Sequence, residues 1–530
     1  MMTDAAPIAL IWLRQCLRLQ DNPMLVAALA QGLQPVFVYC WHPEGEGDWP
    51  LGGASKWWLH YSLQALERDI TARGSQLMLI REAPEQALPT LAKYLNVKHV
   101  WADCRVEPAA RAQTQRVDQA LKQAGIAPEW LISNWVLDHD ALKNGQGEPY
   151  QVYSALWRAW APALADTQFK LLTAPELFTL PQSTQDALAT LTAPKPQALG
   201  ALKLLSPLGW DAAFNQHWQP GEAGARKALT HFLSTRVQTY NHDRDRPYKP
   251  GTSRLSPHLR FGELSPRQII QATIARMESV DGTSQTINWA KGTAGVSAGS
   301  PKSVQNAVKY IQEVLWREFA YYLLWHFPHT ANAPLKPAFN AFPWVDDPAG
   351  LARWQAGLTG FPIVDAGMRE LWHTGWMHNR VRMIAGSFLV KDLRINWLEG
   401  ARWFWDTLVD ADLASNTLGW QWVAGCGADA APYFRIFNPT LQAQKFDPEV
   451  AYTRQWVPEY DPGRAALNAK GALFKTAHAA GGLKPAGVRP RALRAVFEQF
   501  NDYPEPMVDH HAARDAALAA LATIKKPSEE

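Results

Sequence analysis

The chain has 530 residues, more than one compact core usually holds, so at least two domains are expected. The net charge is only +3, which excludes a globally basic nucleic-acid binder and requires any such contact to come from a local basic face. No apolar run approaches the roughly 20 residues that span a bilayer, and the N-terminus lacks the basic start of a secretory signal. We therefore expect no membrane contact and a cytoplasmic location. The four cysteines form no CxxC pair, so no metal site is expected, and isolated thiols suit a reducing compartment.

Residues 1–137 alternate short apolar runs with amphipathic stretches. The apolar runs 8–13, 35–39, 77–80 and 97–103 predict buried strands, and residues 56–73 and 108–124 show helical periodicity. Such alternation predicts an α/β domain with a doubly wound parallel sheet. No GxGxxG follows the first strand, so we do not expect the first turn of this sheet to hold the cofactor.

The rest of the chain changes character twice. Residues 138–226 are rich in Pro, Ser, Thr and Gly and predict an interdomain connector with some helix, including SALWRAW. Residues 227–510 predict an all-α domain, with helices over 304–325, 365–373, 378–392 and 397–409. Residues 511–530 predict a last helix and a tail. Segments 279–303 and 461–490 are rich in small residues and resemble inserted surface loops. The 25 tryptophans could simply be large core aromatics.

Three stretches of the helical part carry candidate chemistry. The first, 251–256 (GTSRLS), places hydroxyls, an arginine and backbone N–H groups in a short turn before a helix. Such a turn could cradle a diphosphate, although an ordinary N-cap with surface polar residues explains it equally well.

The second stretch is a helix with Asn379, Arg382, Met383 and Gly386 on one face. Arg382 among apolar neighbours needs a carboxylate, and Asp410 in the third stretch is the candidate partner. In that stretch Asp412 could accept a hydrogen bond from a ring N–H, and Asn416 could present its amide to a redox-active nitrogen. A metal site is the competing interpretation, but no histidine accompanies the two aspartates.

The motifs WMHNRVRM, DADLASN and WQW…PYFRIFNP, in this order, resemble the photolyase/cryptochrome family. The resemblance runs from Ile8 to about Phe446 and resumes at YPEPMVDHHAARDAAL. It implies an α/β antenna domain followed by an all-α domain that binds FAD.

The resemblance also implies which residues hold the flavin. The FAD-binding positions match Tyr240, Thr252, Ser253, Arg254, Leu255, Ser256, Arg317, Arg382, Asp410, Ala411, Asp412 and Asn416. Asn416 matches the position that faces flavin N5, where plant cryptochromes carry Asp. A neutral amide is expected to favour the fully reduced, anionic flavin that repair requires.

A lesion pocket is implied as well. Glu313 matches the family acid that hydrogen-bonds the damaged bases, Trp316 and Trp422 match aromatic walls beside a flipped-out lesion, and Met383 matches a methionine next to it. Positions that contact the DNA backbone near the lesion match Arg244, Asn379, Arg380 and Arg435. A (6-4) photolyase would carry two histidines where this chain has His378 and Asn379, which favours cyclobutane dimers.

Trp420, Trp397 and Trp344 match the family's electron-transfer chain from the flavin to the surface. The antenna chromophore stays open. The match to folate-binding members around Glu107 is loose, so methenyltetrahydrofolate, a deazaflavin or no antenna all fit. The family's acid near the first strand is replaced by Cys16, which could leave an arginine unpaired. LWREFAYYLLWHFP resembles class I or class III members.

The expected function is light-driven repair of cyclobutane pyrimidine dimers, performed by a monomer on UV-damaged DNA. A cryptochrome photoreceptor and a (6-4) photolyase are the alternatives. Glu313, Met383 and Asn416 together favour repair, and the family's last matching helix ends close to the terminus, which argues against a signalling extension.

Overall fold

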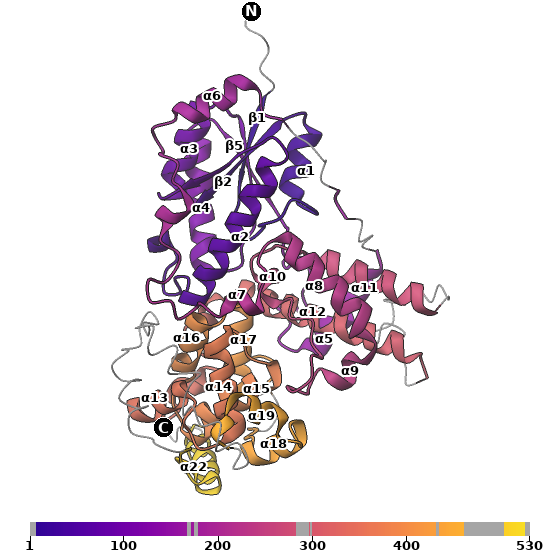
Figure 1. Ribbon diagram of the computed structural model, residues 1–530, viewed down its shortest axis with the longest axis vertical. Helices are drawn as coiled ribbons and strands as arrows, with labels where there is room; N and C mark the ends of the chain where they lie inside the picture. The colour runs from indigo at the N-terminus through magenta and orange to yellow at the C-terminus, as the bar shows by residue number, and fades with distance from the viewer. Residues whose placement is uncertain are drawn as a thin grey trace, which may run out of the picture.

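The protein is described from a computed structural model that covers residues 7–166, 171–173, 179–281, 296, 299–430, 434–460 and 503–524. Most of the expected loop 279–303, all of the expected loop 461–490 and the end of the tail lie outside these residues. Figure 1 shows the α/β domain at one end of the molecule and the helices of the second half at the other.

Five parallel strands form the sheet, in the order β3-β2-β1-β4-β5. Their bounds are β1 Ile8–Trp12, β2 Gln34–Cys40, β3 Leu77–Ile80, β4 His99–Asp103 and β5 Ala127–Leu131. The order reverses between β1 and β4, as in a doubly wound sheet, so the predicted fold class is confirmed. The sequence predicted four of these strands and missed β5, an edge strand of five residues that contains Pro128 and Glu129.

Alternate residues of β1 face opposite sides of the sheet. Ala9 and Ile11 join the core under α1 (Pro23–Ala30) and α2 (Gly53–Thr71). Leu10 and Trp12 join the core under α3 (Pro84–Tyr94) and α4 (Pro108–Gln123). Helices therefore cover both faces of the sheet, which explains why its strands are apolar throughout.

The connector does not form a unit of its own. Helix α5 (Tyr153–Asp166) packs on α12 (Lys302–His326) of the second half. Helix α6 (Gln182–Thr190) packs on the α/β domain, where Leu188 enters the core under α3 and α4. The two ends of the predicted connector thus belong to opposite halves of the molecule.

The second half is helical, as predicted. Its α-helices are α7 Phe214–His217, α8 Glu222–Thr235, α9 Tyr240–Asp243, α10 Ser256–Arg260, α11 Pro266–Asp281, α12 Lys302–His326, α13 Pro348–Ala356, α14 Pro362–Thr374, α15 Asn379–Ser387, α16 Trp397–Thr407, α17 Leu413–Ala424, α18 Pro439–Phe446, α19 Ala451–Trp456 and α22 His510–Thr523. The helix predicted over 378–392 is interrupted, because α15 ends at Ser387 and continues as one π-helical turn, Phe388–Asp392. Within the described part of the chain, no helix is long and apolar enough to cross a membrane.

The core under α1 and α2 continues into the helical half. Trp58 of α2 is fully buried, and its indole N–H donates to Glu263 at 3.0 Å. Helix α2 also packs against α16, where a Cβ on Gly52 would lie 2.4 Å from the backbone oxygen of Trp405. This close approach fixes the α/β domain against the helices that carry the candidate site.

Candidate functional site

A cavity of about 170 Å³, the helical cavity, lies between α15, α16 and α17. Its lining consists of Asn379, Arg382, Met383, Gly386, Phe404, Leu408, Asp410, Ala411, Asp412, Ser415, Asn416, Gly419, Trp420 and Val423. A Cβ on Gly419 would meet nothing within 4 Å, so the absence of a side chain there keeps the cavity open. The second and third sequence motifs therefore meet in one place.

The predicted pair of Arg382 and Asp410 is present. The Arg382 guanidinium donates to both carboxylate oxygens of Asp410, at 2.9 and 3.1 Å, and its Nε donates to the carbonyl of Met377. Ser256 Oγ donates to the same carboxylate at 2.6 Å. The Asp410 side chain is 3% exposed, so these donors take the place of water around its carboxylate.

Asp412 is fixed by two donors. It is the N-cap of α17, where its carboxylate accepts from Ser415 N at 2.8 Å. It also accepts from the hydroxyl of Tyr321 at 2.6 Å, and that hydroxyl in turn accepts from Arg317 at 2.6 Å. Burial raises the pKa of Tyr321 well above its usual value, which keeps the phenol protonated as a donor. Arg317 itself lies outside the lining of the helical cavity and donates to Asn134 O, so it reaches the cavity only through Tyr321.

Asn416 has a defined amide orientation. Its Nδ2 donates to the carbonyl of Ala401 on α16 at 3.0 Å. The side chain lines the cavity, so Oδ1 and the second N–H of the amide are available to a bound group.

The GTSRLS turn leads into the short helix α10, as predicted. Arg254 adopts the left-handed backbone conformation at φ 53°. Its guanidinium lies between the indoles of Trp218 and Trp376, with the guanidinium carbon 4.4 and 4.7 Å from their ring centroids. Its buried Nε has no hydrogen-bond partner. The side chains of Leu255 and Tyr240 are buried, and Thr252 and Ser253 are half-buried.

Glu313 and Trp316 lie on α12, which packs against α17 but contributes no residue to the helical cavity. The Glu313 carboxylate pairs with Arg244 and, at 2.9 Å, with Lys309. Lys309 was not among the sequence predictions, although its i, i+4 spacing from Glu313 is a usable signal.

The remaining DNA-contact candidates lie on or near α15 and α17. Asn379 and Met383 line the helical cavity, and Arg380 pairs with Asp245 at 2.8 Å. Arg435 is exposed, and its guanidinium carbon lies 5.9 Å from the ring centroid of Trp422.

The three candidate electron-transfer tryptophans differ in exposure. Trp420 lines the helical cavity and packs against the first turn of α16, where a Cβ on Gly400 would lie 2.1 Å from its ring. Trp397 starts the same turn and is buried, whereas Trp344 is partly buried. Trp420 also contacts Phe404 and Trp354, with ring centroids 5.0 and 6.2 Å apart.

The polar groups around the helical cavity suit a flavin dinucleotide. Asn416 Oδ1 and the Asp412 carboxylate are acceptors for ring N–H groups, while the unpartnered Arg254 Nε beside the GTSRLS turn is a donor for an anionic linker. Acceptors thus line the helical cavity, and a cationic donor lies on the turn that Ser256 links to Asp410.

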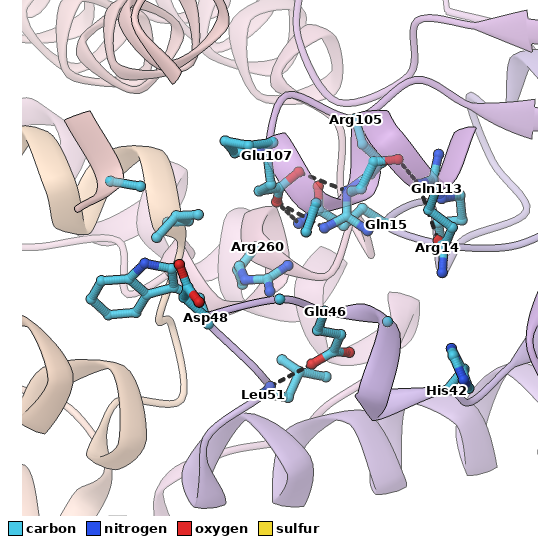
Figure 2. Close-up of a pocket in the computed structure, with 18 of the residues that line it drawn as sticks. Arg14, Gln15, His42, Glu46, Asp48, Leu51, Arg105, Glu107, Gln113 and Arg260 are labelled. Atoms are coloured by element: carbon cyan, nitrogen blue, oxygen red, sulfur yellow. Dashed lines mark hydrogen bonds and ion pairs between the residues drawn. The ribbon is translucent and has the colours of Figure 1, made fainter. Parts of the chain in front are cut away.

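A second, larger cavity of about 290 Å³, the sheet-edge cavity, was not predicted (Figure 2). It lies at the carboxyl ends of β1, β2 and β4, which is where open α/β sheets bind ligands, and residues of the helical half close it. Its ionisable lining residues are Arg14, His42, Glu46, Asp48, Arg105, Glu107 and Arg260. The sequence signals were the sheet edge and the loose match to folate-binding members around Glu107, because the other residues come from separate loops.

Glu107 is the N-cap of α4 and pairs with Arg105 at 2.8 Å. Burial alone would raise the pKa of Glu107, but the charge and hydrogen bonds of Arg105 lower it to about 2. Gln15 also donates to Glu107, at 3.0 Å (Figure 2). Burial and the neighbouring Arg105 lower the pKa of Arg14 to about 10. Folate recognition by Glu107 would therefore have to compete with an internal ion pair.

Arg260 connects the two cavities. Figure 2 shows its guanidinium pointing into the sheet-edge cavity. Its Nε donates at 2.5 Å to the carbonyl of Ala411, which lines the helical cavity.

Replacement of the family's acid by Cys16 leaves neither nearby arginine unpaired. Arg18 is fully buried and donates to four oxygens: the backbone carbonyls of Asp21, Ser133 and Gly262, and Oδ1 of Asn134. Arg14 donates to the oxygens Asp103 O, Ala110 O and Thr114 Oγ1. Neutral oxygens thus take the place of a carboxylate.

Known proteins share these features. Residues 9–176 match the DNA photolyase family, and residues 310–523 match the FAD binding domain of DNA photolyase. A deoxyribodipyrimidine photo-lyase of Agrobacterium fabrum is 39% identical, over 99% of this chain and 100% of the relative. Cryptochrome-2 of Arabidopsis thaliana is 32% identical, over 98% of this chain and 79% of the relative.

A solved bacterial class III photolyase from Agrobacterium tumefaciens superposes with a TM-score of 0.81, at 37% identity, over 99% of both chains. Family match, full-length identity and fold agree with the flavin-binding features of the helical cavity. The chain therefore belongs to the DNA photolyase family and binds FAD in its helical half.

Proposed function

We propose that this protein splits cyclobutane pyrimidine dimers in UV-damaged DNA with the energy of blue light. The observation that carries the proposal is Asn416, an amide at the position where plant cryptochromes carry an acid. Its side chain is a neutral amide with one N–H held by the carbonyl of Ala401, so it brings an acceptor oxygen and no titratable proton to the cavity. Relatives named photo-lyase and cryptochrome both match this chain, and the amide favours the photo-lyase.

When bound, FAD supplies the light-excited electron that starts cleavage of the dimer. The residues of the chain position the flavin. Asp412 and Asn416 orient the ring system, and the Arg382–Asp410 ion pair forms the charged part of the cavity wall. Trp420, Trp397 and Trp344 provide a row of oxidisable indoles from the cavity towards the surface.

The lesion is proposed to bind beside α12 and α17. Glu313 hydrogen-bonds the damaged bases, Trp316 and Trp422 flank them, and Met383 lies next to them. Phosphate contacts come from Arg244, Asn379, Arg380 and Arg435. In this structure Arg244 and Lys309 fix the Glu313 carboxylate, which supports its role as a preorganised group.

We further propose that the sheet-edge cavity holds an antenna chromophore. Methenyltetrahydrofolate and a deazaflavin both combine an aromatic ring with an anionic tail, and Arg14, Arg105 and Arg260 line the cavity. Class III membership is supported by the likeness to the Agrobacterium tumefaciens structure.

A monomer in the cytoplasm is the proposed working form. All four cysteines are free thiols, which suits a reducing compartment. Size-exclusion chromatography with light scattering, at several protein concentrations, tests the monomer.

One illumination assay tests the function. FAD-loaded, reduced protein is mixed with an oligonucleotide containing one cyclobutane thymine dimer, and the recovery of thymine absorbance is followed under blue light and in the dark. Light-dependent recovery is expected. Glu313→Gln should slow it about ten- to a hundredfold while the flavin spectrum is unchanged. No recovery would promote the cryptochrome alternative, and recovery only with a (6-4) substrate would promote the other photolyase type.

A further inference from the structure

Tyr153, the first residue of α5, stacks on Trp316. Their ring centroids are 3.9 Å apart and the ring planes differ by 12°. The Tyr153 hydroxyl donates to the carbonyl of Gln312 on α12 at 3.0 Å, which fixes the ring along the same helix. Tyr153 is 9% exposed, whereas Trp316 is only half-buried. One face of the Trp316 indole is therefore covered by a ring that is itself fixed at its far end.

The same segment also contacts the loop that follows α17. Asp429 N donates to the carbonyl of Gln151 at 3.0 Å. Burial raises the pKa of Asp429, and the nearby backbone N–H of Tyr153 offsets part of that rise. This loop leaves the helix that carries Trp422, so residues 151–153 contact the supports of both aromatic walls.

Tyr153 belongs to a region that the sequence presents as a connector between domains. A linker alone needs no ring stacked on a half-exposed indole and no hydrogen bond to a distant loop. A half-exposed tryptophan without such support would sample several rotamers, and ordering it on binding would cost affinity.

We propose that Tyr153 is a positioning residue that holds Trp316 in the orientation in which it receives the flipped-out lesion. This inference rests on the proposed function, in which Trp316 flanks the lesion. Tyr153 acts through Trp316 and does not touch the substrate. Its removal should weaken binding of damaged DNA selectively, because undamaged DNA does not use the pocket.

The experiment measures binding in the dark by FAD-loaded protein. The probes are a labelled oligonucleotide with one cyclobutane thymine dimer and the same oligonucleotide without damage. Tyr153→Leu is expected to raise the Kd for the dimer about three- to tenfold and to leave the Kd for undamaged DNA within twofold. Tyr153→Phe keeps the ring and should stay within twofold of wild type for both. Tyr153→Met, flexible but without a ring, should behave like the Leu variant and replaces it if that protein does not retain FAD.

Two comparisons separate positioning from general stability. Trp160→Leu removes a buried ring from the same helix and core. It should lower the unfolding temperature without changing the ratio of dimer to undamaged affinity. In a double-mutant cycle, Tyr153→Leu should add no further loss to Trp316→Leu, because the two effects pass through one side chain.

Two results would overturn the inference. Tyr153→Leu and Tyr153→Met could leave dimer affinity at the wild-type value, or their effect could add fully to that of Trp316→Leu. A Trp316→Leu protein with wild-type dimer affinity would instead remove the lesion wall from the proposed function, which is a separate and distinguishable failure.

Discussion

The helical cavity draws its lining from α15, α16, α17 and the loop before α17, whereas the sheet-edge cavity draws on loops of both halves of the molecule. In the first, an arginine and an aspartate pair across two neighbouring segments. In the second, the pair of Arg105 and Glu107 is local, and its other charged groups arrive from loops far apart in the chain. A cavity built from helices that pack directly together can hold a cofactor with little help from the other domain. The sheet-edge cavity exists only when the two halves are docked.

One segment forms the wall between them. Asp412 lines the helical cavity, its neighbour Leu413 lines the sheet-edge cavity, and Arg260 holds the carbonyl of Ala411. A group bound at the sheet edge would therefore lie against the backbone that positions the flavin-side carboxylates. This shared wall makes it useful to damage each cavity separately and to compare the outcomes.

The largest effect is expected from Asp410→Ala. The substitution leaves the Arg382 guanidinium without its carboxylate and Ser256 without its acceptor. The free energy of unfolding should fall by about 2–3 kcal/mol, since the arginine is partly solvated. The affinity for FAD should fall by tenfold or more. The ratio of flavin absorbance to protein after dialysis measures it. Wild-type flavin content in this variant would show that the pair does not support the cofactor.

Glu107→Ala is the matched change at the other cavity and should have a smaller effect. It leaves the half-buried Arg105 without its ion-pair partner, so unfolding free energy should fall by about 2 kcal/mol. Flavin content should stay at the wild-type level, and binding of methenyltetrahydrofolate or a deazaflavin should change. In the double variant Arg105→Met/Glu107→Leu most of the stability should return, because no orphan charge remains. Loss of FAD in Glu107→Ala would mean that the two cavities are not separable.

The sequence predicted residues of the helical cavity but few of the sheet-edge cavity, and the reason is physical. Arg382 and Asp410 could be paired because each lies in an apolar stretch where an isolated charge is costly. The sheet-edge residues have no common spacing, and each one alone is typical of a surface loop. Tyr153 was hidden in the same way, because its stacking on Trp316 depends on how a low-periodicity segment packs.

The fold shows the same distinction. Buried strands such as β1 are continuous apolar runs and were predicted, but β5 at the sheet edge carries Pro128 and Glu129 and has no such run. The π-helical turn at Phe388–Asp392 follows an unbroken helical pattern, so only tertiary packing distinguishes it from the α-helix before it.

A pH-dependent difference of intermediate size is expected at Glu370, near the helical cavity. Burial raises its pKa to about 7, although Tyr452 OH donates to the carboxylate at 2.7 Å and Arg254 and Arg382 lie nearby. Because the folded pKa lies above the unfolded value of about 4.5, the folded state binds more protons, and its stability falls as pH rises from about 4.5 to about 7.

Glu370→Gln removes this loss and keeps an acceptor for Tyr452. Its unfolding free energy relative to wild type should therefore increase by about 1–3 kcal/mol between pH 5 and pH 8. Thermal unfolding of the FAD-bound proteins across that range measures the difference. Glu318→Gln on α12 is the positive control. Burial likewise raises the pKa of Glu318 to about 7, so the stability of this variant relative to wild type should change with pH in the same direction. If the difference in unfolding free energy between Glu370→Gln and wild type does not change with pH, Glu370 is ionised in the folded protein without cost.

The smallest expected effect concerns the DNA-binding face, which the proposed function places on the helical half and not on the α/β domain. Arg435 is exposed beside Trp422, and neutralising it as Arg435→Met should remove about one phosphate contact. The plot of log Kd against log salt concentration should become shallower by about one unit. Damaged and undamaged oligonucleotides should weaken together by a few fold, because a phosphate contact carries no information about the lesion. Arg68→Met removes another exposed cation, on α2 in the α/β domain, and should leave the slope unchanged. If instead Arg68→Met lowered the slope and Arg435→Met did not, the basic face would belong to the domain that carries the sheet-edge cavity, and the lesion pocket beside α12 and α17 would be misplaced.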